Sequence, residues 1–279
     1  MLYLNYNGKL LKDDALIIGA NNRGLRYGDG VFETMKYSNG KLILADEHFA
    51  RLWKGMQTLQ FDIPKHFTPN RLQDELLQLL LKNNHNDIAR IRITICRSDG
   101  GLYDPANHQP NYILQTWPLP ENNGVWNSNG LVLGIYEEAR KAIDKFSNIK
   151  HNNYLPYVMA ALFAKQQKWN DAILLNSNDR ICDTTIANLF LIKDEMVYTP
   201  ELSEGCVAGV MRKEVVSFLK GNNYSVTEKK IMQEDLLDAD EIFLTNSIYN
   251  IRWVQRIGDK QFNNALTQKI YAALLPTIS

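Results

Sequence analysis

Hydrophobic residues recur along the chain at two spacings, one typical of helices and one typical of strands. From residue 46 to 59 and from 70 to 82 they return every three or four positions, which predicts two amphipathic helices. Between Ile88 and Cys96, isoleucines alternate with arginine and threonine, which predicts a strand with one buried face. Asp46 stands where a residue that caps the first helix is expected.

Other apolar stretches predict further elements. Asn-Gly pairs at 7–8 and 39–40 predict tight turns beside short strands at 9–11 and 41–44. The remaining strands are predicted at 112–116, 131–136, 172–175, 189–192, 224–231 and 241–245, and the remaining helices at 154–168, from the glycines at 205–209 through 219, and at 266–275. Because strands and helices are mixed in both halves, we expect an α+β fold.

The chain has 279 residues, which favours about two domains at roughly 150 residues each. Residues 117–124 contain two prolines, two asparagines and a glycine, which is typical of a linker. We therefore predict an N-terminal α+β domain at 1–116, a linker at 117–124 and a C-terminal α/β domain at 125–279.

Composition narrows the class of ligand and the compartment. There are 31 basic and 31 acidic residues and no basic block, which argues against a nucleic-acid partner. No signal peptide and no apolar run of about 18 residues is evident, so we expect no membrane segment. The three cysteines have no CxxC spacing and predict neither disulfides nor a zinc site. A cytoplasmic protein that acts on a small molecule is expected.

Several catalytic motifs are missing. The sequence has no GxSxG, HExxH or Walker A motif, and its five histidines are scattered without metal-ligand spacing. Gly28-Asp-Gly30 begins like a dinucleotide fingerprint, but Glu33 stands at the position of the third glycine. We therefore expect no metal site and no serine hydrolase.

Two charged residues are candidates for chemistry. Lys150 lies between an apolar strand and an apolar helix, where a sheltered lysine can form a Schiff base. Asp183 follows a polar turn and precedes an apolar strand, so it could point inward as a fixed negative charge. The alternatives are a solvated surface lysine and an aspartate that merely caps a turn.

Three other features suit an anion such as phosphate. Gly205–Gly209 opens a helix whose first N–H groups lack partners, although a flexible loop is the alternative. Arg51 lies off the apolar face of its helix with His48 beside it, although a solvated arginine is the alternative. Thr245 ends a strand and could add a hydroxyl donor to the same phosphate.

Taken in order, these segments resemble the class IV aminotransferases, which are the fold-type IV pyridoxal-phosphate enzymes. That family includes branched-chain aminotransferase, D-amino-acid aminotransferase and 4-amino-4-deoxychorismate lyase. The similarity covers nearly the whole chain and is carried by the segments Arg23–Thr34 (RGLRYGDGVFET), Glu47–Leu52, Ser147–Pro156, Asp183–Phe190, Tyr198–Pro200, Gly209–Arg212 and Thr245–Ser247. It implies two domains with the active site in the cleft between them.

The resemblance also implies a cofactor, pyridoxal 5′-phosphate, and residues that hold it. Lys150 matches the lysine that forms the Schiff base and moves the proton of the substrate's α-carbon. Arg51 matches the arginine that binds the phosphate group. The backbone amides of Val210 and Met211 and the side chain of Thr245 are expected to complete that phosphate site.

Asp183 is the position at which this sequence departs from the family. The family usually has a glutamate there, which pairs with the pyridine nitrogen and keeps it protonated. Aspartate keeps the charge but is one methylene shorter, so the carboxylate either falls short of the nitrogen or bridges to it through a water molecule. Tyr154 is expected near the phenolic oxygen of the cofactor.

The resemblance further implies a homodimer in which the partner chain supplies a loop to each active site. Residues 97–105 are the candidate loop, with a glycine-rich surface loop as the alternative. Arg97 and Tyr103 on this loop, together with Phe32 and Asn246, are candidate contacts to the substrate.

Three functions remain open at this stage. We favour transfer of an amino group from a small or branched-chain amino acid to a 2-oxo acid. The alternative is 4-amino-4-deoxychorismate lyase activity, which releases pyruvate and 4-aminobenzoate, because residues 150–155 and 245–247 resemble members of both kinds. A protein that binds pyridoxal phosphate without catalysis is a third hypothesis. The sequence does not specify the substrate or its D or L configuration.

Overall fold

A computed structural model describes residues 1–278 of the chain. These residues form two compact units. Unit 1 contains residues 1–123 and Ile149–Asn153, and unit 2 contains Gly124–Asn148 and the chain from Tyr154 onward. The segment that carries Lys150 thus belongs with unit 1, whereas the sequence analysis assigned it to the C-terminal domain.

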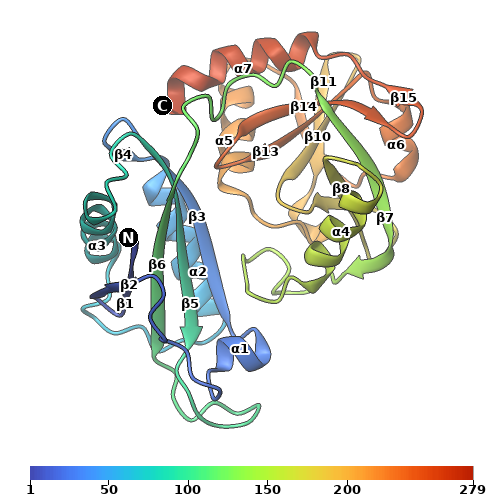
Figure 1. Cartoon of the computed structure of the whole chain (residues 1–279). Coiled ribbons are helices and arrows are strands. Elements are labelled where there is room, and N and C mark those ends of the chain that lie inside the picture. Colours follow the sequence, from blue (N-terminus) through green and yellow to red (C-terminus); the bar gives the residue numbers. More distant parts are fainter. Residues whose placement is uncertain (279) are drawn as a thin grey trace. The chain divides into compact units, whose positions relative to one another are not determined.

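Unit 1 is built around a six-stranded antiparallel sheet with the order β2-β1-β6-β5-β3-β4 (Figure 1). Its elements are β1 (Tyr3–Tyr6), β2 (Lys9–Lys12), α1 (Arg23–Tyr27), β3 (Gly30–Ser38), β4 (Lys41–Leu42), α2 (Ala45–Thr58), α3 (Pro69–Lys82), β5 (Ile88–Arg97) and β6 (Pro110–Pro118). The helices expected at 46–59 and 70–82 and the strand expected at 88–96 are confirmed. Strand β3, however, had not been predicted.

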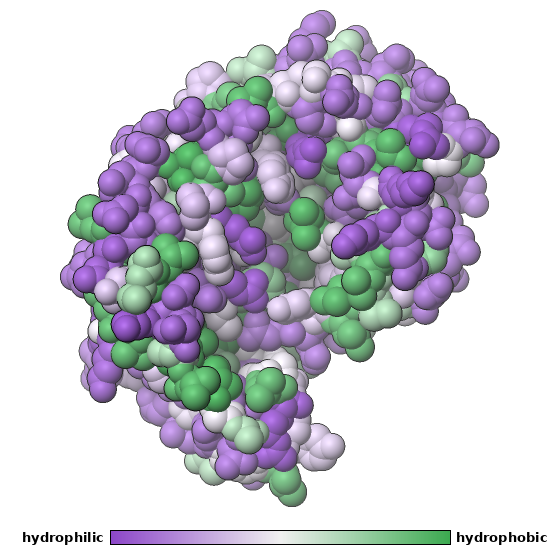
Figure 2. Space-filling view, viewed as in Figure 1, coloured by the Kyte–Doolittle hydropathy of each residue, from purple (hydrophilic) through white to green (hydrophobic). Residues whose placement is uncertain are grey.

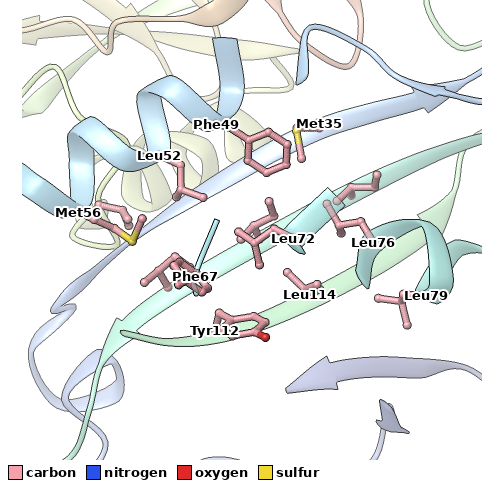
Figure 3. Packing of buried hydrophobic residues seen from close by; sticks show 14 of the residues in the cluster. Met35, Phe49, Leu52, Met56, Phe67, Leu72, Leu76, Leu79, Tyr112 and Leu114 are labelled. Atoms are coloured by element: carbon pink, nitrogen blue, oxygen red, sulfur yellow. The ribbon is translucent and has the colours of Figure 1, made fainter. Parts of the chain in front are cut away.

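The core of unit 1 lies between the sheet and the helices α2 and α3. Figure 3 shows Phe49, Leu52 and Met56 of α2 beside the strands, with leucines of α3 in the same cluster. Ile91, Ile93 and Ile95 of β5 point into this core because they occupy alternate positions of the strand, while the intervening arginine and threonine side chains point to the opposite face. The period-two pattern therefore sets which face of the sheet is available for other contacts.

Local turns explain where several elements of unit 1 begin. The Asn-Gly turns predicted at 7–8 and 39–40 have positive φ at both residues and join the hairpins β1–β2 and β3–β4. The prediction that Asp46 caps α2 is wrong. The cap position is occupied by Leu44, which has a left-handed backbone, and Asp46 lies within the first turn, where its charge favours the helix dipole.

Unit 2 contains a mixed nine-stranded sheet with the order β12-β11-β10-β13-β14-β7-β8-β9, and β15 pairs with β14. Its elements are β7 (Leu131–Lys141), α4 (Leu155–Gln166), β8 (Asp171–Asn176), β9 (Ile181–Thr184), β10 (Asn188–Lys193), β11 (Met196–Pro200), a 3-10 turn (Leu202–Glu204), α5 (Val210–Gly221), β12 (Val226–Lys229), α6 (Gln233–Asp238), β13 (Glu241–Asn246), β14 (Asn250–Ile257), β15 (Lys260–Gln261) and α7 (Ala265–Ile278). The pairs β11–β12, β14–β7 and β7–β8 are parallel, and the others are antiparallel.

Buried residues line both faces of this second sheet. Ala160 and Ala164 of α4 pack on one face against Ala172 and Leu174 of β8, together with the buried thiols of Cys182 and Cys206. A separate cluster that includes leucines and isoleucines of β7, β10 and β13 lies in the same unit. The strands β8 and β10 are buried along nearly their whole length, which agrees with their uninterrupted apolar sequences.

The visible surface is mostly hydrophilic, with apolar residues gathered in separate patches (Figure 2). Within residues 1–278, no helix combines the length and the apolarity needed to cross a membrane.

Candidate active site

Lys150 is held at the beginning of β3 by backbone hydrogen bonds. Phe32 N donates to Lys150 O at 2.9 Å, and Asn152 N donates to Gly30 O at 2.9 Å. Ile149 anchors the same segment in the hydrophobic core of unit 1. The segment therefore joins unit 1 as an extra extended strip, which fixes the backbone position of the lysine.

The side chain of Lys150 lies against Phe32. Its Nζ is 4.4 Å from the centroid of the Phe32 ring, and Cζ of Arg92 is 4.1 Å from the same centroid. Lys150 is half-buried, so it is neither a fully solvated surface lysine nor sealed in the core. The structure thus brings two of the predicted site residues, Lys150 and Phe32, into contact.

Arg51 is part of a buried charge cluster on α2 and β3. Its Nε and Nη2 donate to both oxygens of Glu33, at 2.7 and 2.6 Å, and Nδ1 of His48 lies 2.7 Å from Glu33 Oε2. Burial raises the pKa of Glu33, but Arg51 and His48 outweigh burial and lower that pKa to about 2. Glu33 is therefore an anion that fixes the direction of the Arg51 guanidinium.

Arg97 and Tyr103 occupy very different surroundings. Arg97 is 5% exposed, and its guanidinium binds Asp29, His108 and the backbone oxygens of Leu59 and Gln60. The side chain of Tyr103 is 89% exposed in the single chain. Their contacts with substrate remain predictions, and in this structure Arg97 ties together loops of unit 1.

Arg23, from the segment RGLRYGDGVFET, holds the loop that carries Tyr103. Its Nη1 donates to Gly100 O at 3.2 Å and to Leu102 O at 2.5 Å, and its Nη2 donates to Tyr103 O at 3.3 Å. Asp29 accepts from Nε of Arg23 at 2.9 Å and from Nε of Arg97 at 3.0 Å. Because one carboxylate joins both arginines, the loop backbone has a defined position although the Tyr103 side chain is exposed.

In unit 2, Asp183 lies in β9 and is 2% exposed. Its Oδ2 accepts hydrogen bonds from Lys141 Nζ, Tyr157 OH and Val207 N, each at 2.9 Å. Its Oδ1 accepts one hydrogen bond, from Asn188 Nδ2 at 2.8 Å. The aspartate is thus a buried, fully oriented carboxylate and not a turn-capping residue on the surface.

The groups beside Asp183 act as donors and not as bases. Burial raises the pKa of Tyr157 well above its ordinary value, and the neighbouring Asp183 raises it further, so the phenol remains protonated. Burial likewise raises the pKa of the Cys206 thiol to about 12, and the pKa of Cys182 is also raised by burial. These cysteines are therefore inert neighbours at neutral pH.

The first turn of α5 provides the predicted phosphate donors. Gly209 is its N-cap, and no side chain caps the helix, so the backbone amides of Val210 and Met211 are at an uncapped positive helix end. Gly209 is needed for close packing, because a Cβ at this position would be 1.9 Å from Asn188 Oδ1. Asn188 in turn is the register partner of Thr245 on the neighbouring strand β13.

Thr245 carries a buried hydroxyl that has no hydrogen-bond partner among residues 1–278. Oγ1 of this residue is inaccessible and unsatisfied, and Thr245 as a whole is only 2% exposed. An orphaned buried hydroxyl normally costs stability, so its presence calls for an explanation, and a bound ligand that accepts from it is one. Val207 connects this region to Asp183, because its N–H binds Asp183 and its carbonyl accepts from Asn188. Unit 2 therefore brings together Asp183 and the predicted phosphate donors.

Asn246 and Tyr154 lie at the ends of elements. Oδ1 of Asn246 accepts from the backbone N–H groups of Ile248 and Tyr249, so this side chain shapes the turn after β13. Tyr154 occupies the N-cap position of α4, and its carbonyl accepts from Tyr157 N and Val158 N. Their contacts with substrate and cofactor remain predictions.

Sequence reasoning missed four polar residues that the structure places around these candidates. They are Glu33, Lys141, Tyr157 and Asn188. The alternation of Val31, Glu33 and Met35 could have indicated that Glu33 points inward. Lys141 gave no such signal, because it follows Glu137, Glu138 and Arg140 and reads as part of a solvated charged stretch.

The comparison with protein families decides the identity of this fold. A family model described as "Amino-transferase class IV" matches residues 30–257. The chain belongs to the class IV aminotransferase family. The predicted resemblance is therefore confirmed, and the family contains both aminotransferases and lyases that depend on pyridoxal phosphate.

Individual relatives of this class IV protein carry different names. Aminodeoxychorismate lyase of Vibrio harveyi is 34% identical over 239 residues, which is 85% of this chain and 86% of that protein. A branched-chain aminotransferase of Thermoproteus uzoniensis, solved with norvaline, has a TM-score of 0.90 at 22% identity and covers 99% of this chain and 94% of its own. Another branched-chain aminotransferase, solved with pyridoxamine 5′-phosphate, has a TM-score of 0.88 at 21% identity, with the same coverage. These structures confirm the fold-type IV architecture, with two sheets in a mixed α+β arrangement.

Proposed function

We propose that this chain is a pyridoxal-phosphate-dependent enzyme that uses Lys150 to bond to the cofactor and transfers an amino group from an amino acid to a 2-oxo acid. The observation that carries the proposal is the orphaned Thr245 hydroxyl, because it stands next to Asn188 and the uncapped start of α5. A phosphate group would accept from that hydroxyl and from the helix amides. The buried carboxylate of Asp183 fits the ring nitrogen of the same cofactor.

The residues of this chain have distinct tasks in the proposed reaction. When bound, pyridoxal phosphate withdraws electrons from the α-carbon of an amino acid. Lys150 would take the proton from that carbon and would act as a proton donor later in the reaction. Thr245 Oγ1 and the amides of Val210 and Met211 would hold the phosphate, and Arg51, oriented by Glu33, would add a positive charge.

The second candidate is aminodeoxychorismate lyase activity. The 34% identity to the Vibrio harveyi enzyme favours it, since a Methanocaldococcus jannaschii protein named "Putative branched-chain-amino-acid aminotransferase" is 29% identical and a D-alanine aminotransferase of Bacillus licheniformis is 27% identical. In that reaction Lys150 would remove the same α-proton, but a bond in the substrate would then break to release pyruvate and leave 4-aminobenzoate. The two activities thus share the cofactor site and differ in the substrate.

Spectroscopy of the protein with added pyridoxal phosphate tests the shared part of the proposal. We expect a yellow absorption band that persists after dialysis and disappears on treatment with borohydride, and we expect the cofactor mass on the Lys150 peptide. Lys150→Ala should abolish this adduct. Lys145→Ala, at an exposed position shortly before Lys150, should not. A protein that never retains the cofactor would overturn the proposal.

Product analysis then separates the candidate activities. A panel of D- and L-amino acids with 2-oxo acids should yield a new amino acid if the protein is an aminotransferase. Aminodeoxychorismate should yield 4-aminobenzoate and pyruvate if it is a lyase. Bound cofactor without exchange of any substrate α-proton for solvent deuterium would instead identify a non-catalytic binding protein.

A further inference from the structure

Lys141 is a buried lysine to which neither the sequence nor the proposed reaction gives a role. It ends β7, it is 6% exposed, and its Nζ lies 2.9 Å from Asp183 Oδ2. A lysine is rarely buried to this extent without a charged partner, because burial of an unpaired ammonium is costly. The pair is therefore a specific feature of this chain and differs from an exposed surface ion pair.

The hydrogen bonds of Asp183 are divided unequally between its two oxygens. Oδ2 accepts from three donors, which are Lys141, Tyr157 and Val207, whereas Oδ1 accepts only from Asn188. A carboxylate offers about two lone pairs on each oxygen, so Oδ2 is saturated and Oδ1 has capacity for one more donor. These donors come from four different segments, so the plane of the carboxylate is fixed.

On the basis of the proposed function, we propose that Lys141 is a positioning residue. Its charge keeps Asp183 ionised, so that the proton of the hydrogen bond between Asp183 and the cofactor stays on the ring nitrogen. Lys141 is in direct contact with the carboxylate. The charge of Lys141 therefore stabilises the Asp183 anion more than it destabilises a positive charge on the ring nitrogen, which would be bound to Oδ1 and lie further away. Without Lys141, the shared proton would move from the ring nitrogen to Oδ1, and the ion pair would become a neutral pair.

The other groups around Asp183 cannot replace this charge. Tyr157 and Asn188 donate neutral hydrogen bonds, and Cys182 and Cys206, which also lie nearby, are held as neutral thiols by burial. Hydrogen bonds from Tyr157 and Val207 orient Oδ2 whether or not Lys141 is charged. Lys141 alone supplies positive charge among these contacts, so the position of the proton depends on it.

The ring nitrogen itself reports on this proposal. Holoenzyme is prepared with pyridoxal phosphate labelled with ¹⁵N in the ring, and the ¹⁵N chemical shift distinguishes a protonated from a neutral ring nitrogen. We expect a protonated nitrogen in the wild type, in Lys141→Arg and in the exposed control Lys145→Met. In Lys141→Met we expect the signal of a neutral nitrogen and a cofactor Kd higher by roughly tenfold or more.

Additional measurements separate a positioning role from a structural one. Lys141→Met in an Asp183→Asn background should change neither the ¹⁵N shift nor the Kd further, because Lys141 acts through Asp183. Thermal unfolding of the apo variants shows whether the substitution also damages the fold. If Lys141→Met does not fold, the wild-type ¹⁵N shift and the rescue by Lys141→Arg still test the proposal.

Two results would overturn the inference. One is a neutral ring nitrogen in the wild-type holoenzyme. The other is a protonated nitrogen and an unchanged Kd in folded Lys141→Met. Both differ from failure of the proposed function, in which the wild type would retain no cofactor or would form no borohydride-stable adduct at Lys150.

Discussion

Two buried carboxylates, Glu33 and Asp183, are each paired with a cation but differ in their capacity to accept further hydrogen bonds. Glu33 uses both oxygens on Arg51 and also contacts His48. Asp183 concentrates three donors on Oδ2 and leaves Oδ1 with a single hydrogen bond. Glu33 is therefore suited to hold another protein side chain in place, whereas Asp183 is suited to accept a hydrogen bond from a ligand.

Asp183→Asn tests the assignment of that carboxylate to the cofactor. The amide removes the negative charge while nearly preserving the shape, so it should weaken electron withdrawal and lower kcat by about 10²-fold or more. The measurement is kcat at saturating cofactor, so that weaker binding does not contribute. An unchanged kcat would remove Asp183 from the mechanism.

Glu33 makes the stability of the protein depend on pH in the acid range. Because its pKa is lowered to about 2 in the folded state from the ordinary value of 4.5, the unfolded chain binds its proton first as the pH falls. The stabilisation is therefore present above about pH 4.5 and is lost as the pH falls towards 2, and it amounts to roughly 3 kcal/mol at most.

Urea unfolding of wild type and Glu33→Gln at several pH values measures this contribution. The wild type should lose more stability between about pH 5 and pH 3 than the variant does. Equal losses in the two proteins would show that the pKa of Glu33 is the same in the folded and the unfolded protein.

At the level of elements, α5 offers a matched pair of glycines at its two ends. Gly209 is packed against Asn188, whereas a Cβ at Gly221 would have no atom within 4 Å. The first glycine therefore controls the fit of the helix start against the strand that carries Asn188. The second has no such neighbour and is replaceable.

Gly209→Ala should displace Asn188 and disturb the start of α5, which raises the Kd for pyridoxal phosphate by roughly tenfold or more. Gly221→Ala should leave the Kd unchanged and stabilise the protein by about 0.4–1 kcal/mol, because alanine restricts the unfolded chain. Cofactor titration and urea unfolding of both variants provide the comparison. Equal Kd values for the two variants would show that the helix start does not bind the cofactor.

The sequence predicts elements well where one periodicity dominates and less well where polar residues are buried. The helices α2 and α3 and the strand β5 follow from their spacing alone. Strand β3 escapes prediction because Glu33 and Lys36 are buried within it and obscure its alternation. Strand β14 is similarly interrupted by Arg252, Gln255 and Arg256.

For the candidate site, too, the sequence predicts residues that lie in local motifs but not contacts between segments that are distant in the chain. Lys150 and Asp183 are found because motifs surround them. The contact of Lys141 with Asp183 joins residues 42 positions apart and depends on the shared pairing of β7 and β9 with β8. Register between strands is a property of the folded sheet, so no local pattern could have indicated this pair.

At the scale of the whole molecule, Lys150 and the buried Asp183 belong to different compact units. Each unit has a hydrophobic core of its own, which places each residue independently. The family resemblance adds that a homodimer is expected and that a partner loop reaches each active site. Tyr103 is the exposed residue of the candidate loop.

Hybrid dimers test whether the loop acts between chains. We expect sedimentation to show a dimer, and we expect Lys150→Ala and Tyr103→Ala each to have low activity. Mixing the two variants should restore activity, because one site of each hybrid would combine an intact lysine with an intact partner loop. Full activity of Tyr103→Ala, or of a monomer, would exclude this role for the loop.

The membership of Ile149–Asn153 in unit 1 also has a consequence for the order of synthesis. All six strands of the first sheet have been translated once the ribosome passes Pro118, but the strip that carries Lys150 is translated about thirty residues later. In the nascent first unit, the edge of β3 near Gly30 therefore has no partner until the start of the second unit and the strip that follows it have been translated. Ribosome stalling before residue 149 would therefore leave the first sheet without the strip that carries Lys150.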